Sequence, residues 1–193
     1  MNEAFYSTQF FGVSAFFNAF AWLLMLVTAV LFFRVNPKWG MVNDVISVIF
    51  LLSIIPLVAY FSMLFAEEHA WQQIAAALVG MAGIIIPALG QTRLIFKRID
   101  FHESTRYFPA FAGIGIWMVW ENRLLAVYNQ SIPWLVWSGM LTGAGVLSAI
   151  LLYKLNQMKN AVFYLSVGLL AVGYPLWAIL LGRWLLAGGA MMY

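Results

Sequence analysis

Long apolar runs, separated by short polar segments, are the feature of this sequence that most limits how the chain can fold. A helix needs roughly 20 mostly apolar residues to cross the ~30 Å hydrocarbon core of a bilayer. Six segments reach that length, namely Phe10–Phe33, Val45–Ala66, Gln73–Phe96, Pro109–Tyr128, Trp134–Tyr153 and Ala161–Trp184. The pattern therefore predicts an all-α, polytopic transmembrane bundle of six helices with short loops.

The composition favours the same class of protein. Hydrophobic residues make up 64% of the chain and charged residues only 9%, whereas soluble domains carry about 25% charged residues. Because the connecting segments are short, consecutive helices should be antiparallel neighbours. No linker or low-complexity stretch divides the sequence, so residues 1–193 are predicted to form a single domain.

The distribution of Lys and Arg predicts the orientation of the helices. Eight of the ten basic residues lie beside the first, third and fifth connections, and these are Arg34, Lys38, Arg93, Lys97, Arg98, Arg106, Lys154 and Lys159. Only Arg123 and Arg183 lie on the opposite side. Because basic residues mark the cytoplasmic side of a membrane, we expect a multi-pass membrane protein with both termini outside. The connection Glu67–Gln72 then faces outward.

Small residues and prolines predict how the helices pack. Gly139 and Gly143 form a GxxxG pair in the fifth segment, and small residues let helix backbones approach closely in a membrane. We expect this pair to pack within the chain; the alternative is a homodimer that meets at the same two glycines. Pro56, Pro87 and Pro175 lie inside apolar segments and should kink their helices.

One apolar segment carries ionisable side chains, which are costly within a bilayer and are therefore candidates for function. Glu121 and Asn122 lie in the fourth segment, close to Trp117 and Trp120. With Arg183 from the sixth segment they could form a ligand pocket that opens to the outside. The preferred interpretation is instead a structural ion pair between Glu121 and Arg183 that joins the two helices.

The second candidate site is a rim on the outer side formed by Glu67, Glu68 and His69. Two carboxylates and an imidazole could bind a divalent metal or relay protons. Adjacent side chains point in different directions, however, so a solvated loop is the preferred interpretation and no metal is predicted. The second histidine, His102, falls on the opposite side, which disfavours a bis-histidine haem.

Other cofactors and partners are disfavoured by missing residue types, and none is predicted. The chain has no cysteine, which excludes cysteine-ligated Fe–S clusters. Retinal is disfavoured because no lysine lies in the middle of an apolar segment. Nucleic acid is disfavoured because the basic residues lie in loops between apolar runs and form no basic face. The lipid bilayer is the one partner that the composition predicts directly.

Several short motifs in the last 80 or so residues resemble a known group of proteins. They are Trp120…Asn122, Ser131-Ile-Pro-Trp134, Gly139…Gly143 and Tyr174-Pro-Leu-Trp177…Gly182-Arg183. This combination resembles the C-terminal half of small bacterial six-helix inner-membrane proteins. The resemblance implies a bacterial inner-membrane location and carries over no activity and no catalytic residue.

Three classes of function agree with the sequence. The first, and the one preferred, is a non-enzymatic accessory or structural subunit of a membrane complex, because the loops are short and polar residues are scarce. The second is a small-solute carrier or substrate-binding subunit that uses the pocket near Glu121. The third is a membrane-embedded enzyme acting on a lipid or quinone, which is disfavoured because few titratable groups are available.

The orientation can be tested by cysteine labelling, because the chain contains no native cysteine. Glu68→Cys should react with a membrane-impermeant thiol reagent added to intact cells, whereas Ile99→Cys, beside the basic Arg98, should react only after permeabilisation. The opposite labelling pattern would overturn the predicted topology.

Overall fold

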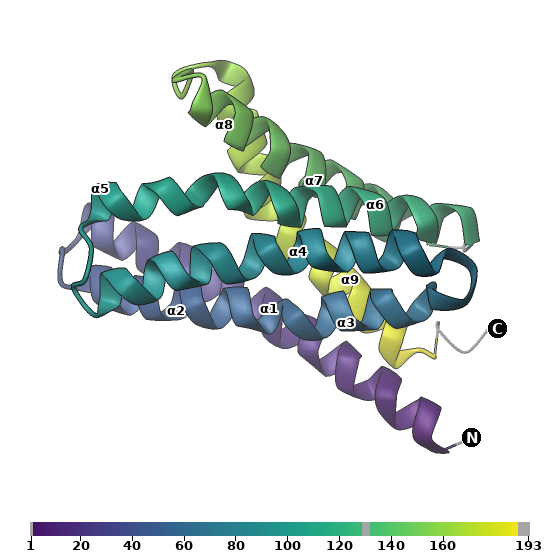
Figure 1. Ribbon diagram of the computed structural model, residues 1–193. Coiled ribbons are helices and arrows are strands. Elements are labelled where there is room, and N and C mark those ends of the chain that lie inside the picture. Colours follow the sequence, from purple (N-terminus) through teal and green to yellow (C-terminus); the bar gives the residue numbers. More distant parts are fainter. Residues whose placement is uncertain (1, 129–131, 189–193) are drawn as a thin grey trace.

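The computed structural model of the chain describes residues 2–128 and 132–188, and within these ranges all the regular secondary structure is helical (Figure 1). The all-α prediction is therefore confirmed for the described part of the chain. The elements are α1 (Asn2–Arg34), α2 (Trp39–Ser53), α3 (Ile55–Leu64), α4 (Ala66–Ile95), α5 (Phe101–Ser104), the 3₁₀ helix η1 (Thr105–Phe111), α6 (Ala112–Tyr128), α7 (Pro133–Lys154), α8 (Ala161–Gly168), the π-helix η2 (Leu169–Gly173) and α9 (Tyr174–Leu186). Ser131, which belongs to one of the resemblance motifs, lies outside these ranges.

Five helical stretches are long and apolar enough to cross a membrane, which is compatible with an integral membrane protein. They are Thr8–Arg34, Trp39–Leu64, Ala66–Ile95, Pro133–Lys154 and Ala161–Leu186, and they correspond to five of the six predicted spans. The other predicted span, Pro109–Tyr128, divides between η1 and α6. Alone, the 17 residues of α6 are about 26 Å long at ~1.5 Å per residue, slightly less than the ~30 Å hydrocarbon core of a bilayer.

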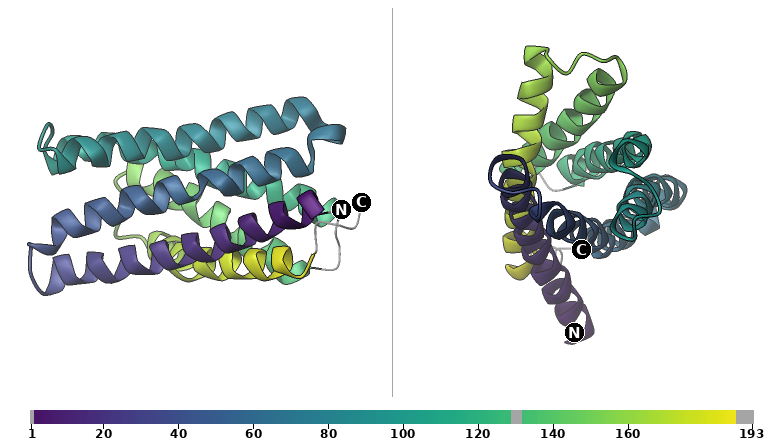
Figure 2. Two further views of the ribbon diagram at one scale, coloured as in Figure 1. Left: turned by 90° about the horizontal axis from the view of Figure 1, so that it is seen from below. Right: turned by 90° about the vertical axis from the view of Figure 1, so that its left-hand side faces the viewer.

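The helices form one continuous set of packed neighbours. α1 packs against α2 and α9, α4 against α2 and α6, and α6 against α7, which packs in turn against α8, η2 and α9. α1 begins and α9 ends at the same end of the bundle, near the junction of α3 and α4 (Figure 2). The turn between α1 and α2 lies with α5 at the opposite end, and α7 and α8 rise at an angle from α4 (Figure 1).

The connection predicted at Glu67–Gln72 is shorter than expected. The departures from helical geometry at this junction are Phe65 (φ −114°, ψ 15°) and His69 (φ −133°, ψ 37°). Glu67 and Glu68 lie in the first turn of α4, where carboxylates interact favourably with the helix dipole. All of Glu67–Gln72 lies within α4, so the assignment of this segment to a loop was wrong.

The connection between α4 and η1 contains α5, a short helix that the hydropathy pattern missed. Asp100 Oδ1 accepts a hydrogen bond from the Glu103 backbone N–H at 2.7 Å, and Glu103 Oε2 accepts one from the Asp100 backbone N–H at 3.2 Å. This reciprocal capping box stabilises the start of a helix, and its Asp-x-x-Glu spacing is visible in the sequence. His102 is exposed on this helix, as expected for a solvated segment.

The three prolines differ in their effect. Pro56 lies at the start of α3, just after the break at Ile54, and Pro175 lies at the start of α9, just after the π-helix. Pro87 lies inside α4, whose one non-helical residue is His69. Kinks were predicted at all three positions; the chain is interrupted beside Pro56 and Pro175, and the helix continues through Pro87.

The interruption before α9 is stabilised by a contact from α1. In an α-helix the carbonyl of Ala171 would accept a hydrogen bond from residue 175, but proline has no N–H to donate. Trp22 supplies a donor instead, because its Nε1 lies 3.2 Å from the Ala171 oxygen. The backbone just before α9 is therefore held in part by the indole of the first helix.

Glycines allow the closest helix contacts. A Cβ on Gly83 would lie 2.5 Å from the backbone nitrogen of Ile114, and one on Gly113 would collide with the carbonyl of Val79, so α4 and α6 meet backbone to backbone. Gly139 and Gly143 also face α6, and a Cβ on Gly143 would lie 2.8 Å from the backbone of Gly115. The GxxxG pair thus packs against α6 within the chain.

We expect Gly83→Ala to lower the free energy of unfolding by about 1–3 kcal/mol, because an added methyl group must push two backbones apart. The matched control is Gly168→Ala, since a Cβ on Gly168 meets nothing within 4 Å. The control should leave the unfolding midpoint in detergent unchanged or slightly raised, because alanine favours helix. Equal effects of both substitutions would contradict the close contact between α4 and α6.

Candidate functional site

The structure brings together three of the five residues predicted to line a pocket. Trp117, Glu121 and Asn122 all lie on α6 and are 0% exposed. Trp120 is partly buried against the core, and Arg183 on α9 is exposed. The central side chains thus point into the bundle, and because they are inaccessible they do not line a pocket that is open to solvent.

Glu121 is paired with a residue that the sequence analysis did not single out. Gln73 on α4 is 2% exposed, and its Nε2 donates a hydrogen bond of 3.1 Å to Glu121 Oε2. The other carboxyl oxygen of Glu121, Oε1, and the amide oxygen of Gln73, Oε1, are both buried and have no hydrogen-bond partner. A glutamine at the start of an apolar segment was the available signal, but nothing in the sequence connects it to Glu121.

The ion pair expected between Glu121 and Arg183 is not formed in the described part of the chain. Arg183 lies in the last turn of α9 and is exposed, which suits a long basic side chain that reaches toward the membrane surface. Arg123 is also exposed and lies over the ring of Trp120, 5.9 Å from its centroid. Both arginines on this side of the bundle therefore lie outside the core.

Asn122 joins three helices. Its Nδ2 donates to the carbonyl of Met118 at 2.8 Å, within α6, and its Oδ1 accepts a 3.1 Å hydrogen bond from Trp177 Nε1 on α9. Gly139 on α7 lies directly against the amide group, because a Cβ there would collide with the Asn122 side chain. The amide is thereby enclosed by α6, α7 and α9.

Aromatic rings fill the space beside this amide. Trp117 packs edge-on against Trp177 at 6.0 Å and against Phe61 at 5.8 Å, and Phe61 stacks on Trp177 at 6.4 Å between centroids. All three rings are 0% exposed. Trp117 is therefore part of the packed core, where no face of its ring is free to stack on a ligand.

A second buried polar centre lies around Asn18 of α1. Its Nδ2 donates to Ser53 Oγ at 2.7 Å and to the carbonyl of Phe50 at 3.3 Å, and its Oδ1 accepts a 2.7 Å hydrogen bond from the Tyr174 hydroxyl. These contacts connect α1, α2 and α9. An asparagine in the middle of the first apolar segment was the sequence signal for this centre.

The predicted outer rim does not converge on one site. Glu67 and Glu68 are exposed, while His69 turns inward, so that its Nε2 lies 2.7 Å from the Tyr128 hydroxyl. Among the described residues, no three acidic, histidine or cysteine side chains are grouped as metal ligands would be. The contact between His69 and Tyr128 instead connects the start of α4 to the end of α6.

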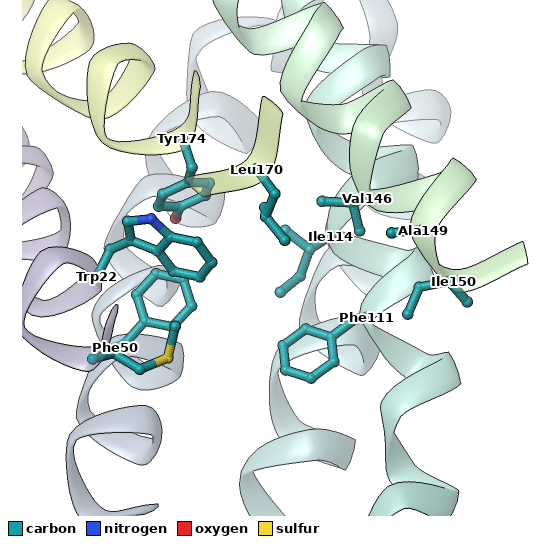
Figure 3. Close-up of a pocket in the computed structure, with 10 residues that line it drawn as sticks. Trp22, Phe50, Phe111, Ile114, Val146, Ala149, Ile150, Leu170 and Tyr174 are labelled. Atoms are coloured by element: carbon teal, nitrogen blue, oxygen red, sulfur yellow. The ribbon is translucent and has the colours of Figure 1, made fainter. Parts of the chain in front are cut away.

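Two of the hollows between the helices are lined almost entirely by apolar side chains. The smaller, of about 200 Å³, separates Trp22, Phe50 and Tyr174 from Phe111 and Ile114 (Figure 3). The polar atoms at its edge are already paired, since Tyr174 bonds to Asn18 and Trp22 to Ala171. This cavity therefore offers no free polar group that could orient a polar solute.

The larger hollow is a groove of about 710 Å³ between α7 and the continuous segment formed by α8, η2 and α9. Trp134, Trp137, Leu165 and Leu176 line it, and Gly168 lies on its wall. We refer to it as the α7–α8 groove. It combines bulky, exposed aromatic and aliphatic side chains with a glycine that has open space in front of it.

Comparison of the chain with protein-family models, with curated proteins and with solved structures finds no match in any of the three. The function proposed for this chain therefore rests on its own sequence and geometry.

Proposed function

We propose that this chain is a six-span protein of the bacterial inner membrane, with both termini outside, and that it acts as a non-enzymatic accessory subunit of a membrane complex. In this proposal α6 is the sixth crossing. Its 17 residues continue from η1, so the helical segment Thr105–Tyr128 is long enough to reach both surfaces. The position of α6 between α4 and α7 supports a crossing rather than a surface helix.

The use of the buried polar side chains supports an accessory role over a carrier or an enzyme. Asn18 and Asn122 are 0% exposed, and each bonds to side chains of other helices. A carrier with a pocket at Glu121 would need that carboxyl group to be reachable, but it too is 0% exposed. The polar groups of the interior are therefore suited to joining helices rather than to binding a solute.

The observation that carries the proposal is the α7–α8 groove. Its walls are apolar and belong to segments long enough to span a membrane, so its natural occupant is apolar and lies within the bilayer. A Cβ on Gly168 would meet nothing within 4 Å, and an exposed glycine on a membrane helix permits a close backbone approach by another helix. We therefore assign the groove to a transmembrane helix of a partner protein.

Site-specific photo-crosslinking in living cells tests this assignment. A photoreactive amino acid at Leu165, which is 64% exposed in the groove, should form an adduct with one defined polypeptide other than this chain. The same amino acid at Leu89, which is 55% exposed on α4, is the matched control and should not form that adduct. Gly168→Leu should abolish the adduct at position 165 by filling the groove.

A second substitution controls for general effects on the protein. Ala59→Leu places the same leucine side chain at an exposed position of α3 and should leave the adduct intact. If position 165 crosslinks only to lipid, or only to a second copy of this chain, the accessory-subunit proposal is wrong.

A further inference from the structure

The pair formed by Gln73 and Glu121 contains more acceptors than donors. The amide of Gln73 gives one hydrogen bond, from Nε2 to Glu121 Oε2 at 3.1 Å. Two oxygens remain, Glu121 Oε1 and Gln73 Oε1, and both are buried without a partner. The side chains are 0% and 2% exposed, so both are shielded from bulk solvent.

An ionised carboxylate is a poor occupant of this position. It can only accept hydrogen bonds, so it could not satisfy Gln73 Oε1, and its charge would lie in an apolar interior where an unpaired charge is strongly unfavourable. In the described part of the chain no Lys, Arg or His forms an ion pair with Glu121. The protonated acid, in contrast, has one O–H donor, and one donor is what the pair lacks.

We propose that Glu121 is a proton-binding site within the membrane, and that its proton is donated to Gln73 Oε1. The amide N–H of Gln73 then bonds to one carboxyl oxygen while the carboxyl O–H bonds to the amide oxygen. This closed acid–amide pair connects α4 to α6 by two hydrogen bonds. Loss of the proton removes one of the two bonds and leaves a charge between the helices, so a single proton controls this contact.

The surrounding titratable groups do not supply a counter-charge. The titratable groups on the elements around Glu121 are Glu67, Glu68, His69 and Arg93 of α4, Tyr60 of α3, Arg123 and Tyr128 of α6, Tyr153 and Lys154 of α7, and Tyr174 and Arg183 of α9. Glu67, Glu68, Arg93 and Lys154 are exposed, and Tyr153 is half-buried. His69 is bonded to Tyr128, Arg123 lies over Trp120, and Tyr174 is bonded to Asn18. Arg183 is exposed and Tyr60 is buried. A proton on Glu121 itself is therefore the source of neutrality.

A divalent metal ion fits this position less well than a proton. Calcium takes about 6–8 oxygen ligands and magnesium about six, whereas two unpaired carboxyl and amide oxygens are available in the pair. Among the described residues no group of three possible metal ligands includes Glu121. A single proton bound to one of these oxygens and donated to the other satisfies both.

Infrared spectroscopy of the protein in lipid nanodiscs tests the proposal directly. At neutral pH the wild-type protein should show the carbonyl stretch of a protonated carboxylic acid, and Glu121→Gln should lack it. Glu121→Gln is suited to this comparison because an amide has the shape of the neutral acid and can also form two hydrogen bonds with Gln73. If Glu121→Gln instead removes a carboxylate band and leaves the acid region of the spectrum unchanged, Glu121 is ionised in the wild-type protein. That result would overturn the proposal.

The role of Gln73 has its own test. Gln73→Leu should shift the acid band to the frequency of a carboxyl group without an amide partner. The exchange variant, Gln73→Glu with Glu121→Gln, places the acid on α4 and the amide on α6 and should restore the original band. An acid band that does not respond to Gln73→Leu would contradict the paired geometry.

Isotope labelling of the wild-type protein tests the protonation of Glu121 without any variant. Wild-type protein grown with carboxyl-labelled ¹³C-glutamate should show the acid band shifted by the isotope, without any substitution. A spectrum with no isotope-sensitive acid band at neutral pH would show that every glutamate is ionised, which would also overturn the proposal.

Discussion

The structure depends on one constraint, which is that polar side chains in the interior of a lipid-surrounded bundle must find their partners on other helices. Between membrane helices there is little hydrophobic driving force, so close packing and interhelical hydrogen bonds decide which helices associate. Asn18 connects α1, α2 and α9, Asn122 connects α6, α7 and α9, and the pair of Gln73 and Glu121 connects α4 and α6. α6 and α9 each take part in two of these three centres.

The irregular parts of the helices follow from the same constraint. Pro175 deprives Ala171 of its α-helical donor, and Trp22 provides another. Gly83 and Gly113 let α4 and α6 touch, and this close approach accompanies the short distance between Gln73 and Glu121. The break before α9, the glycine contacts and the buried hydrogen bonds therefore all result from how the helices pack against one another.

Features that depend on local composition could be predicted from the sequence. Apolar runs of sufficient length identified the five helical stretches that are long and apolar enough to cross a membrane, and the packing role of Gly139 and Gly143 followed from their spacing. The capping box at Asp100 and Glu103 had a readable signal that hydropathy alone missed. The positions of the helix ends were predicted less accurately. Trp71 and Gln72, for example, are polar or interfacial in character and yet belong to α4.

Features that depend on the rotation of one helix against another could not be predicted. Charge suggested Arg183 as the partner of Glu121, but the partner is the neutral Gln73. The sequence also placed Trp117 and Asn122 together without indicating that both face Trp177 in the core. Which side of a helix faces inward depends on all its neighbours, and no short motif contains that information.

A double-mutant cycle on Asn122 and Trp177 tests most directly whether buried interhelical hydrogen bonds hold this bundle together. The free energy of unfolding in lipid bicelles is measured for wild type, Asn122→Ala, Trp177→Phe and the double variant. The account predicts a coupling energy of about 0.6–2 kcal/mol, the range found for hydrogen bonds between membrane helices. The same cycle with Trp137, which is 58% exposed, in place of Trp177 should be additive. Additive effects at Asn122 and Trp177 would contradict the account.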